Sequence, residues 1–387
     1  MLLRSLRLDR FLSFGPGTDP LELSKLNVLI GPNGSGKSNF IEAIDFLRAA
    51  PTDLLAPVRQ GGGVSAWIWR GEPGAKAEVE AVLAYRPESS RNLRHRVSFT
   101  EVGARLEIVD ERIEDDEPST GQTRHDFYFG YEHGRPVLDV KNGKRELRRE
   151  DIDPQQSILS QRKDPDQYPE LSFVGDQYSK IRLYRDWGFG RVSSPRRPQP
   201  PDLPTDHLRE DAQNLGLILN RFRRDVPTKR ILIDALRQVF EGVVDFSVQI
   251  EGGTAQIFLE EERWTIPATR LSDGTLRWLA LLAILLDPAP PPLVCIEEPE
   301  LGLHPDLMPA LARLLVGASE HTQVVVTTHS DVLVDALSDT PEAVIVCERH
   351  EGRTTMKRLE RDALATWLEA YALGELWRKG ELGGTRW

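Results

Sequence analysis

Apolar and polar positions follow two different periods along this chain. Residues 26–30 form a mostly apolar run that is typical of a buried strand. Residues 39–47 carry apolar side chains three and four positions apart, as one face of a helix does. Residues 271–348 alternate between the two patterns, with apolar strands expected at 293–296 and 324–326. Alternation of helix and strand predicts an α/β domain.

The middle of the chain has another character. Four short β-favouring runs between residues 61 and 140 are separated by turn-forming residues, which predicts an antiparallel β lobe. Residues 141–205 are basic and rich in proline, and 195–204 is expected to be an extended surface loop. The predicted strands of the β lobe are 77–85, 94–100, 104–110 and 126–131.

A helical lobe is predicted next. Helical spacing covers 208–222 and 228–240, and the strand patterns at 243–250 and 254–259 predict a hairpin. The chain shows no internal repeat and no sustained heptad pattern, so a long coiled coil is not expected. The predicted segments are 1–60 (N-terminal part of the α/β lobe), 61–140 (β lobe), 141–205 (basic, proline-rich insertion), 206–270 (helical lobe and hairpin) and 271–387 (C-terminal part of the α/β lobe).

Composition limits which binding partners and which cellular compartment can be expected for this chain. The 387 residues are 40% hydrophobic, enough for a core with two or three lobes. The net charge of -11 argues against a wholesale nucleic-acid coat and leaves room for a local basic surface. Cys295 and Cys347 lie in apolar runs and are expected to be buried free thiols, which suits the cytoplasm. The apolar run at the N-terminus is expected to be a strand rather than a signal peptide, and no membrane span is expected.

The segment from Gly31 to Ser38 matches the phosphate-loop pattern G-x-x-x-x-G-K-[ST] in full. Glycines let backbone N–H groups turn inward around phosphate oxygens at the positive end of a helix. Lys37 can reach the outer phosphates, and the Ser38 hydroxyl can bind Mg²⁺. The alternative is a chance glycine-rich turn, against which the strand–loop–helix setting counts. The predicted nucleotide-binding residues here are Gly31, Pro32, Asn33, Gly34, Ser35, Gly36, Lys37, Ser38 and Asn39.

Two carboxylates follow the apolar strand at 293–296. Glu297 and Glu298 give the Walker B arrangement, in which a strand beside the phosphate-loop strand delivers acids to the nucleotide. Successive side chains of an extended chain point in different directions. We therefore expect Glu297 to hold Mg²⁺ together with Ser38, and Glu298 to act as the general base or to position the attacking water. The alternative is a charged strand end without function.

Two further stretches complete the candidate site. His329 lies at the tip of another apolar strand, where it could donate to the γ-phosphate, although a lone histidine is usually structural. Ser272, Asp273 and Gly274 open an apolar helix that Ser272 or Asp273 can cap. Exposed N–H groups at such a helix start can bind an anion, whereas the plain alternative is a capped helix. Lys37, Glu298 and His329 are the predicted catalytic residues.

Together these stretches resemble the ATPase heads of the ABC class, and more narrowly the SMC, RecF and RecN-like group and the OLD-type defence ATPases. The resemblance covers roughly residues 1–50 and 210–348, and their order along the chain makes the set specific. The stretches that carry it are 11–14 with the phosphate loop and Asn39, 271–276, 296–300, 302–305 and 327–330.

The resemblance implies a P-loop ATPase with a mixed sheet flanked by helices and with the β lobe and helical lobe inserted. It also implies a composite site in a homodimer that forms on ATP. Ser272 and the backbone at Gly274 would contact the γ-phosphate of the nucleotide held by the partner copy, and His329 would sense the γ-phosphate in its own copy. Hydrolysis would then release the dimer.

The chain departs from the family pattern at three places. Asp273 replaces a glycine common in ABC signatures, and we expect it to turn back and cap its own helix. Walker B ends in Glu-Glu rather than Asp-Glu, although either carboxylate can hold Mg²⁺ through water. The glutamine that normally completes the metal shell is not identified, with Gln156 and Gln177 as candidates. Arg70 is a candidate for contact with nucleotide or DNA, and a surface arginine is the alternative.

The sequence favours a compact ATPase that acts on DNA in repair or anti-phage defence. Basic runs at 141–149 and 180–197 could contact a phosphate backbone, or could be solvated faces. The alternative is a regulatory subunit that controls a separately encoded nuclease or toxin, since no Toprim nuclease is expected after the ATPase lobe. An inert ATP-binding scaffold is a third alternative, against which Glu298 and His329 count.

Overall fold

The computed structural model describes residues 1–72, 74–85, 91–118, 125–132, 135–140, 143–147, 151–185 and 188–384. The chain forms two compact units, each assembled from segments that are distant in sequence. Unit 1 comprises Met1–Ile181, Val344–Leu359 and Leu382–Trp387, and unit 2 comprises Arg182–Ala343 and Glu360–Glu381. The five predicted segments divide the chain more finely, and their boundaries remain a prediction.

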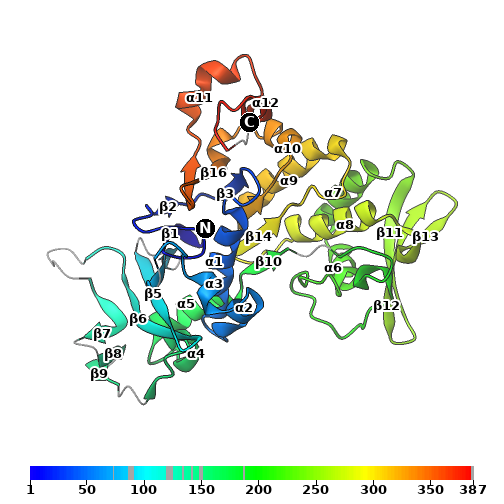
Figure 1. Ribbon diagram of the computed structural model, residues 1–387. Helices are drawn as coiled ribbons and strands as arrows, with labels where there is room; N and C mark the ends of the chain where they lie inside the picture. The colour runs from blue at the N-terminus through cyan, green and yellow to red at the C-terminus, as the bar shows by residue number, and fades with distance from the viewer. Residues whose placement is uncertain are drawn as a thin grey trace. The chain divides into compact units, whose positions relative to one another are not determined.

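An antiparallel sheet forms the β lobe of unit 1, whose later strands are the cyan arrows of Figure 1. Its strand order is β2-β1-β4-β5-β6-β7-β8-β9, so the first strand of the chain joins the lobe by pairing with β4. The antiparallel β lobe predicted from the short β-favouring runs is thereby confirmed. The strands are β1 (Leu3–Asp9), β2 (Leu21–Glu22), β4 (Ala77–Ala84), β5 (Asn92–Val102), β6 (Arg105–Asp115), β7 (Phe127–Glu132), β8 (Arg135–Val140) and β9 (Gly143–Glu146).

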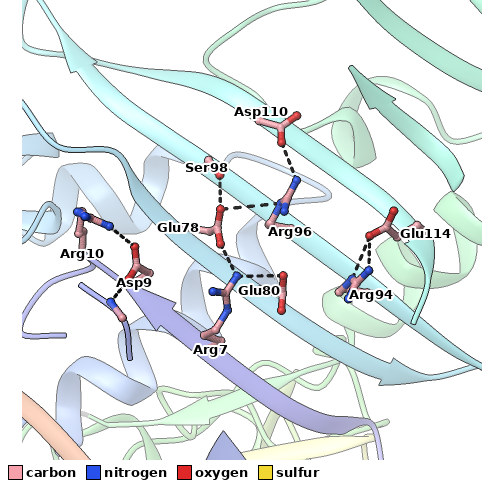
Figure 2. Close-up of polar contacts among 11 residues, drawn as sticks. Arg7, Asp9, Arg10, Glu78, Glu80, Arg94, Arg96, Ser98, Asp110 and Glu114 are labelled. Atoms are coloured by element: carbon pink, nitrogen blue, oxygen red, sulfur yellow. Dashed lines mark hydrogen bonds and ion pairs between the residues drawn. The ribbon is translucent and has the colours of Figure 1, made fainter. Parts of the chain in front are cut away.

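Arginines and carboxylates pair between β1 and β4 and between β5 and β6 of this sheet (Figure 2). Arg7 on β1 lies 2.6 Å from Glu78 and 3.2 Å from Glu80 on β4. Arg96 on β5 lies 2.9 Å from Asp110 on β6. Pairs exposed to this degree contribute little stability each, roughly 0–1 kcal/mol. Their consequence is electrostatic, because the carboxylates balance the positive charge on this face.

The α/β part of unit 1 holds the phosphate loop. Strand β3 (Leu26–Ile30) is fully buried and pairs in parallel with β16 (Val344–His350), which pairs in antiparallel fashion with β17 (Arg353–Arg358). Parallel and antiparallel pairs occur together, as predicted for a mixed sheet. Its helices are α1 (Lys37–Ala49), α2 (Leu55–Gln60), α3 (Val64–Trp67), α4 (Ile158–Gln161) and α5 (Pro169–Ser179).

Aromatic packing anchors helix α1 in unit 1. Phe46 of α1, Phe11 and Trp67 are buried, and their ring centroids lie 5.5–5.9 Å apart. Phe99 of β5 packs against both phenylalanines at 5.3 and 6.2 Å. Such contacts add to the large apolar area that each ring buries. The cluster therefore joins α1 to the β lobe.

Unit 2 is an α/β unit with a small antiparallel sheet (Figure 1). Strands β10 (Arg182–Tyr184), β14 (Leu293–Glu297) and β15 (Gln323–Thr327) pair in parallel. Strands β11 (Val243–Glu251), β12 (Thr254–Glu261) and β13 (Thr265–Pro267) form the second sheet. The helices are α6 (Leu215–Phe222), α7 (Val226–Arg237), α8 (Asp273–Leu285), α9 (Met308–Ser319), α10 (Asp331–Asp335), α11 (Arg361–Leu368) and α12 (Leu373–Arg378), with short 3-10 turns at Ser194–Arg196, Ala268–Arg270, Pro305–Leu307 and Pro341–Ala343.

One predicted helix is shorter than expected. Helix α6 begins at Leu215 rather than at Leu208. The Asn214 side chain accepts the Arg209 N–H and donates to the carbonyl oxygens of Pro204 and His207. These bonds stabilise a loop in place of a helical turn, as asparagine does near helix starts.

The predicted basic insertion 141–205 contains β9, α4, α5, β10 and the 3-10 turn Ser194–Arg196. Of its first basic run, residues 141–142 and 148–149 lie outside the described residues, while 143–146 form β9. The predicted extended loop is bridged to β12, because the N–H and carbonyl of Gln199 bond to Ala255.

Both cysteines are free and buried, as predicted. Burial raises the pKa of the Cys347 thiol to about 12, so this thiol stays protonated at neutral pH. Among the helices of the described residues, none has the length and apolar character that crossing a bilayer requires.

Candidate nucleotide site

Close backbone contacts shape the phosphate loop between β3 and α1. The φ angles of Gly31 and Gly36 are 144° and 104°. A Cβ on Gly31 would lie 2.2 Å from the carbonyl oxygen of Cys347, and one on Gly36 would lie 2.3 Å from Oγ1 of Thr354. Only glycine fits both positions, because they combine positive φ with the absence of space.

Lys37 is buried at the start of α1. Its Nζ donates to the carbonyl oxygens of Gly31 at 2.7 Å and of Pro32 at 3.1 Å. The ammonium group therefore lies at the inner edge of the loop, where phosphate oxygens could replace these carbonyl partners. The next residue, Ser38, is exposed at the first turn of the helix, as a hydroxyl that serves a metal must be.

Hydrogen bonds of Ser13 and Thr354 hold the phosphate loop in place. Nδ2 of Asn39 donates to Oγ of Ser13 at 2.6 Å. Oγ1 of Thr354 on β17 lies 2.7 Å from the same Ser13 oxygen and 3.0 Å from the carbonyl oxygen of Ser35. Ser13 belongs to the Phe-Leu-Ser-Phe stretch, so that stretch positions both the loop and helix α1.

In unit 2, the two predicted carboxylates lie at the end of strand β14, with Glu297 as its last residue and Glu298 directly after it. Oε1 of Glu297 lies 3.4 Å from Nε of Arg185. Glu298 follows the strand with φ of 46°, and its N–H donates to the carbonyl oxygen of Thr327 at 3.0 Å. A positive φ is uncommon for a residue with a side chain, and such conformations gather at functional sites.

His329 lies beside Glu298. Its Nε2 is 3.6 Å from Oε1 of Glu298, and both side chains are more than a third exposed. The two predicted catalytic residues of unit 2 thus lie together at the ends of neighbouring parallel strands, where α/β sheets bind ligands. A carboxylate and an imidazole at this distance can exchange a proton through water or form an ion pair.

Sequence reasoning missed Glu300 as a site residue. One carboxylate oxygen accepts both the hydroxyl of Thr328 at 2.7 Å and the N–H of His329 at 2.8 Å. Burial raises the pKa of Glu300, and these two hydrogen bonds oppose the shift. Glu300 therefore connects the loop after β14 with the loop after β15 and orients His329.

The apolar helix predicted after Ser272 is α8, and Ser272 caps it. Oγ of Ser272 accepts the N–H of Thr275 at 3.0 Å, which confirms the capping prediction for this residue. A Cβ on Gly274 would lie 2.8 Å from the carbonyl oxygen of Gly302. Arg277 donates to the carbonyl oxygen of Leu301. The start of α8 thus packs against the loop that follows Glu300.

The role expected for Asp273 is wrong. Asp273 does not cap α8 but forms an ion pair with Arg196, whose side chain is only 10% exposed. Arg196 also donates to the carbonyl oxygens of Leu271 and Phe189. Its guanidinium offsets the negative charge that Asp273 brings to the helix start. Arg196 stood in the basic run of the sequence, but no spacing rule connects it to residue 273.

Both candidates for the metal-shell glutamine have other contacts. Gln156 donates to Asp53 and accepts from the N–H of Leu54, beyond the C-terminal end of α1. A helix of 13 residues spans about 20 Å, which separates this point from the phosphate loop at the other end. Gln177 is near the surface and contacts Asp176. Arg70 is exposed, and its role stays a prediction.

Comparison with known proteins gives a family and a fold. Residues 26–335 match the family model described as "AAA domain, putative AbiEii toxin, Type IV TA system". No curated protein is a significant match to the chain.

Three solved Smc heads share the fold at low sequence identity. One is a Smc head bound to the C-winged helix domain of ScpA (TM-score 0.59, 18% identity, covering 94% of this chain and 99% of that one). A second, from Pyrococcus furiosus, has an extended coiled coil and is bound to the C-terminal domain of ScpA (0.61, 17%, 95% and 99%). A third, from Pyrococcus yayanosii, has a coiled coil and joint (0.51, 13%, 95% and 99%). The chain therefore has the fold of an ABC-type ATPase head of the SMC-like group.

Proposed function

The chain belongs to the AbiEii-related AAA domain family, and from this premise we propose that it binds ATP with Mg²⁺, hydrolyses it and pairs with a second copy as it does so. The observation that carries the proposal is the contact between Glu298 and His329 at the ends of β14 and β15. A scaffold that only bound ATP would not need this pair.

Each residue has a proposed part in the reaction. The loop from Gly31 to Lys37 holds the phosphates, and Glu298 takes the proton of the attacking water or orients it. His329 donates to the γ-phosphate. The Ser38 hydroxyl and the Glu297 carboxylate are hard oxygen ligands, which suit Mg²⁺. When bound, Mg²⁺ neutralises charge on the phosphates.

The proposed second copy completes the site. Ser272 and Asp273 at the capped start of α8 are exposed, and an anion is stabilised at such a helix end. Ser272 and Gly274 of one copy would contact the γ-phosphate held by the other. The balance of Asp273 by Arg196 supports this reading, since an unbalanced carboxylate would repel that phosphate.

ATP is expected to determine whether the protein is a monomer or a dimer in solution. Light scattering should give a monomer with ADP and a dimer with Mg²⁺ and a non-hydrolysable ATP analogue, because only the γ-phosphate is shared between copies. EDTA, which removes Mg²⁺, serves as the control and should restore the monomer. A mass that does not depend on the nucleotide would contradict the composite site.

Action on DNA remains the leading proposal for what the protein acts on. However, several basic side chains of the run 180–197 are paired with carboxylates. In the basic run 180–197, Lys180 pairs with Asp176, Arg185 lies 3.4 Å from Glu297, and Arg196 pairs with Asp273. Arg191 and Arg197 of the same run are exposed. A DNA contact would rest mainly on such exposed side chains.

Those paired charges favour a second candidate, a regulatory subunit that holds or releases a separately encoded nuclease or toxin. Two of the similar Smc heads are bound to a domain of another protein, which shows that such heads can carry a protein partner. Copurification with a nuclease or toxin would support this candidate.

Filter binding separates the two candidates. If the chain acts on DNA, the dimer formed with ATP should retain labelled duplex or single strands, and the affinity should fall steeply as salt rises because phosphate contacts release counterions. The double variant Arg191→Ala, Arg197→Ala should then weaken retention. No affinity with ATP, or affinity that does not fall with salt, would exclude DNA as the cargo.

A further inference from the structure

Gly384 of unit 1 lies against Gly31, the first residue of the phosphate loop, although more than 300 positions separate the two residues in sequence. A Cβ on Gly384 would lie 3.4 Å from Cα of Gly31 and 2.8 Å from Cγ1 of Val346. Gly384 is buried. The main chain at Gly384 therefore occupies the space beside the first residue of the loop.

Glu348 of β16 forms a hydrogen bond with Gly384. Its Oε1 accepts the N–H of Gly384 at 2.9 Å. This hydrogen bond is the main reason that the pKa of Glu348 lies below its usual value, so the carboxylate is charged at neutral pH. A charge-assisted bond of this kind is stronger than one between neutral groups.

Gly31 is thereby enclosed on two sides. One side faces the carbonyl oxygen of Cys347, which a Cβ on Gly31 would approach to 2.2 Å, and the other faces Gly384. The carbonyl oxygen of Gly31 accepts Nζ of Lys37 at 2.7 Å. If the Gly31 peptide could move, the position of the Lys37 ammonium group would consequently change with it.

We propose that Gly384 and Glu348 form a brace that positions the phosphate loop for ATP. This inference rests on the proposed function. Gly384 and Glu348 are positioning residues that act through Gly31 and Lys37. Without the brace, ATP would have to order the Gly31 peptide as it binds. Ordering one residue costs about a factor of ten in affinity.

The test compares two glycine variants of the full chain. Gly384 and Gly103 have φ of 66° and 56°, so alanine brings similar backbone strain to both, but a Cβ on Gly103 meets nothing within 4 Å. Gly384→Ala should weaken the binding of a fluorescent ATP analogue about tenfold, raise KM by a similar factor and leave kcat at saturating ATP unchanged. Gly103→Ala should lower the melting temperature through backbone strain alone and leave affinity unaltered.

Variants of Glu348 give a second measurement that does not depend on glycine strain. Glu348→Gln keeps an acceptor oxygen and Glu348→Ala removes it, so affinity for the analogue should fall in the order wild type, Gln, Ala. Unchanged affinity in both Gly384→Ala and Glu348→Ala would overturn the brace and leave the ATPase proposal standing. A wild-type chain that binds no ATP would overturn the ATPase proposal and the brace with it.

Discussion

Lys37→Ala is expected to bind ATP at least about 100-fold more weakly than the wild type, because charge-assisted hydrogen bonds contribute roughly 1.5–3 kcal/mol each. Lys37 is buried, and its Nζ donates to the carbonyl oxygens of Gly31 and Pro32. The variant loses the ammonium that would meet the phosphates and leaves two carbonyl groups without this donor. Titration calorimetry with Mg²⁺-ATP measures the affinity directly.

Lys76→Ala is the matched control for this experiment. Lys76 is exposed, so its loss should alter neither affinity nor melting temperature. Lys37→Ala should also remain monomeric with ATP, since a chain that holds no γ-phosphate offers none to its partner. Wild-type affinity in Lys37→Ala would contradict the phosphate-loop assignment itself.

The sequence predicts the local parts of the site well, for a physical reason. The stretch from Leu26 to Lys37 needs only its own residue order to form a strand, a glycine loop and a helix start, and β3 and α1 are found as expected. The same holds for Ser272, because a capping hydroxyl bonds to an N–H three residues along the chain. Short-range rules are sufficient wherever partners are neighbours in sequence.

The parts that could not be predicted depend on partners far apart in sequence. Arg196 reaches Asp273 across 77 positions, so a helix cap was expected where an ion pair occurs. Glu300 bonds to Thr328 and His329 across a loop, a helix and a strand. No periodicity encodes such contacts, since they arise when the packed elements bring side chains together.

Glu298 and Glu300, the two carboxylates that follow β14, have different environments. Glu300 is half-buried and its carboxylate accepts the N–H of His329, whereas Glu298 is 38% exposed and lies near the imidazole itself. A residue that takes a proton from water must remain accessible to water. We therefore propose that Glu300 holds the backbone of His329 and that Glu298 takes part in the catalytic step.

Glu298→Gln should bind ATP with wild-type affinity, form a stable dimer and hydrolyse ATP about 10²–10⁴ times more slowly, which is the range that a general base contributes. Glutamine keeps the size and the polar contacts of the side chain but cannot accept the proton of the attacking water. Phosphate release under single-turnover conditions measures hydrolysis, and light scattering on the same sample measures the dimer. Because hydrolysis is what would release the partner, the dimer should persist for as long as ATP does.

Glu262→Gln, an exposed carboxylate in unit 2, is the control and should hydrolyse ATP at the wild-type rate. The two site variants then separate binding from chemistry, since Lys37→Ala should lose the nucleotide and the dimer together, while Glu298→Gln should keep both and lose only turnover. If Glu298→Gln hydrolyses ATP as fast as the wild type, the water is positioned by another group. His329, whose Nε2 lies 3.6 Å from the Glu298 carboxylate, would be the next residue to substitute.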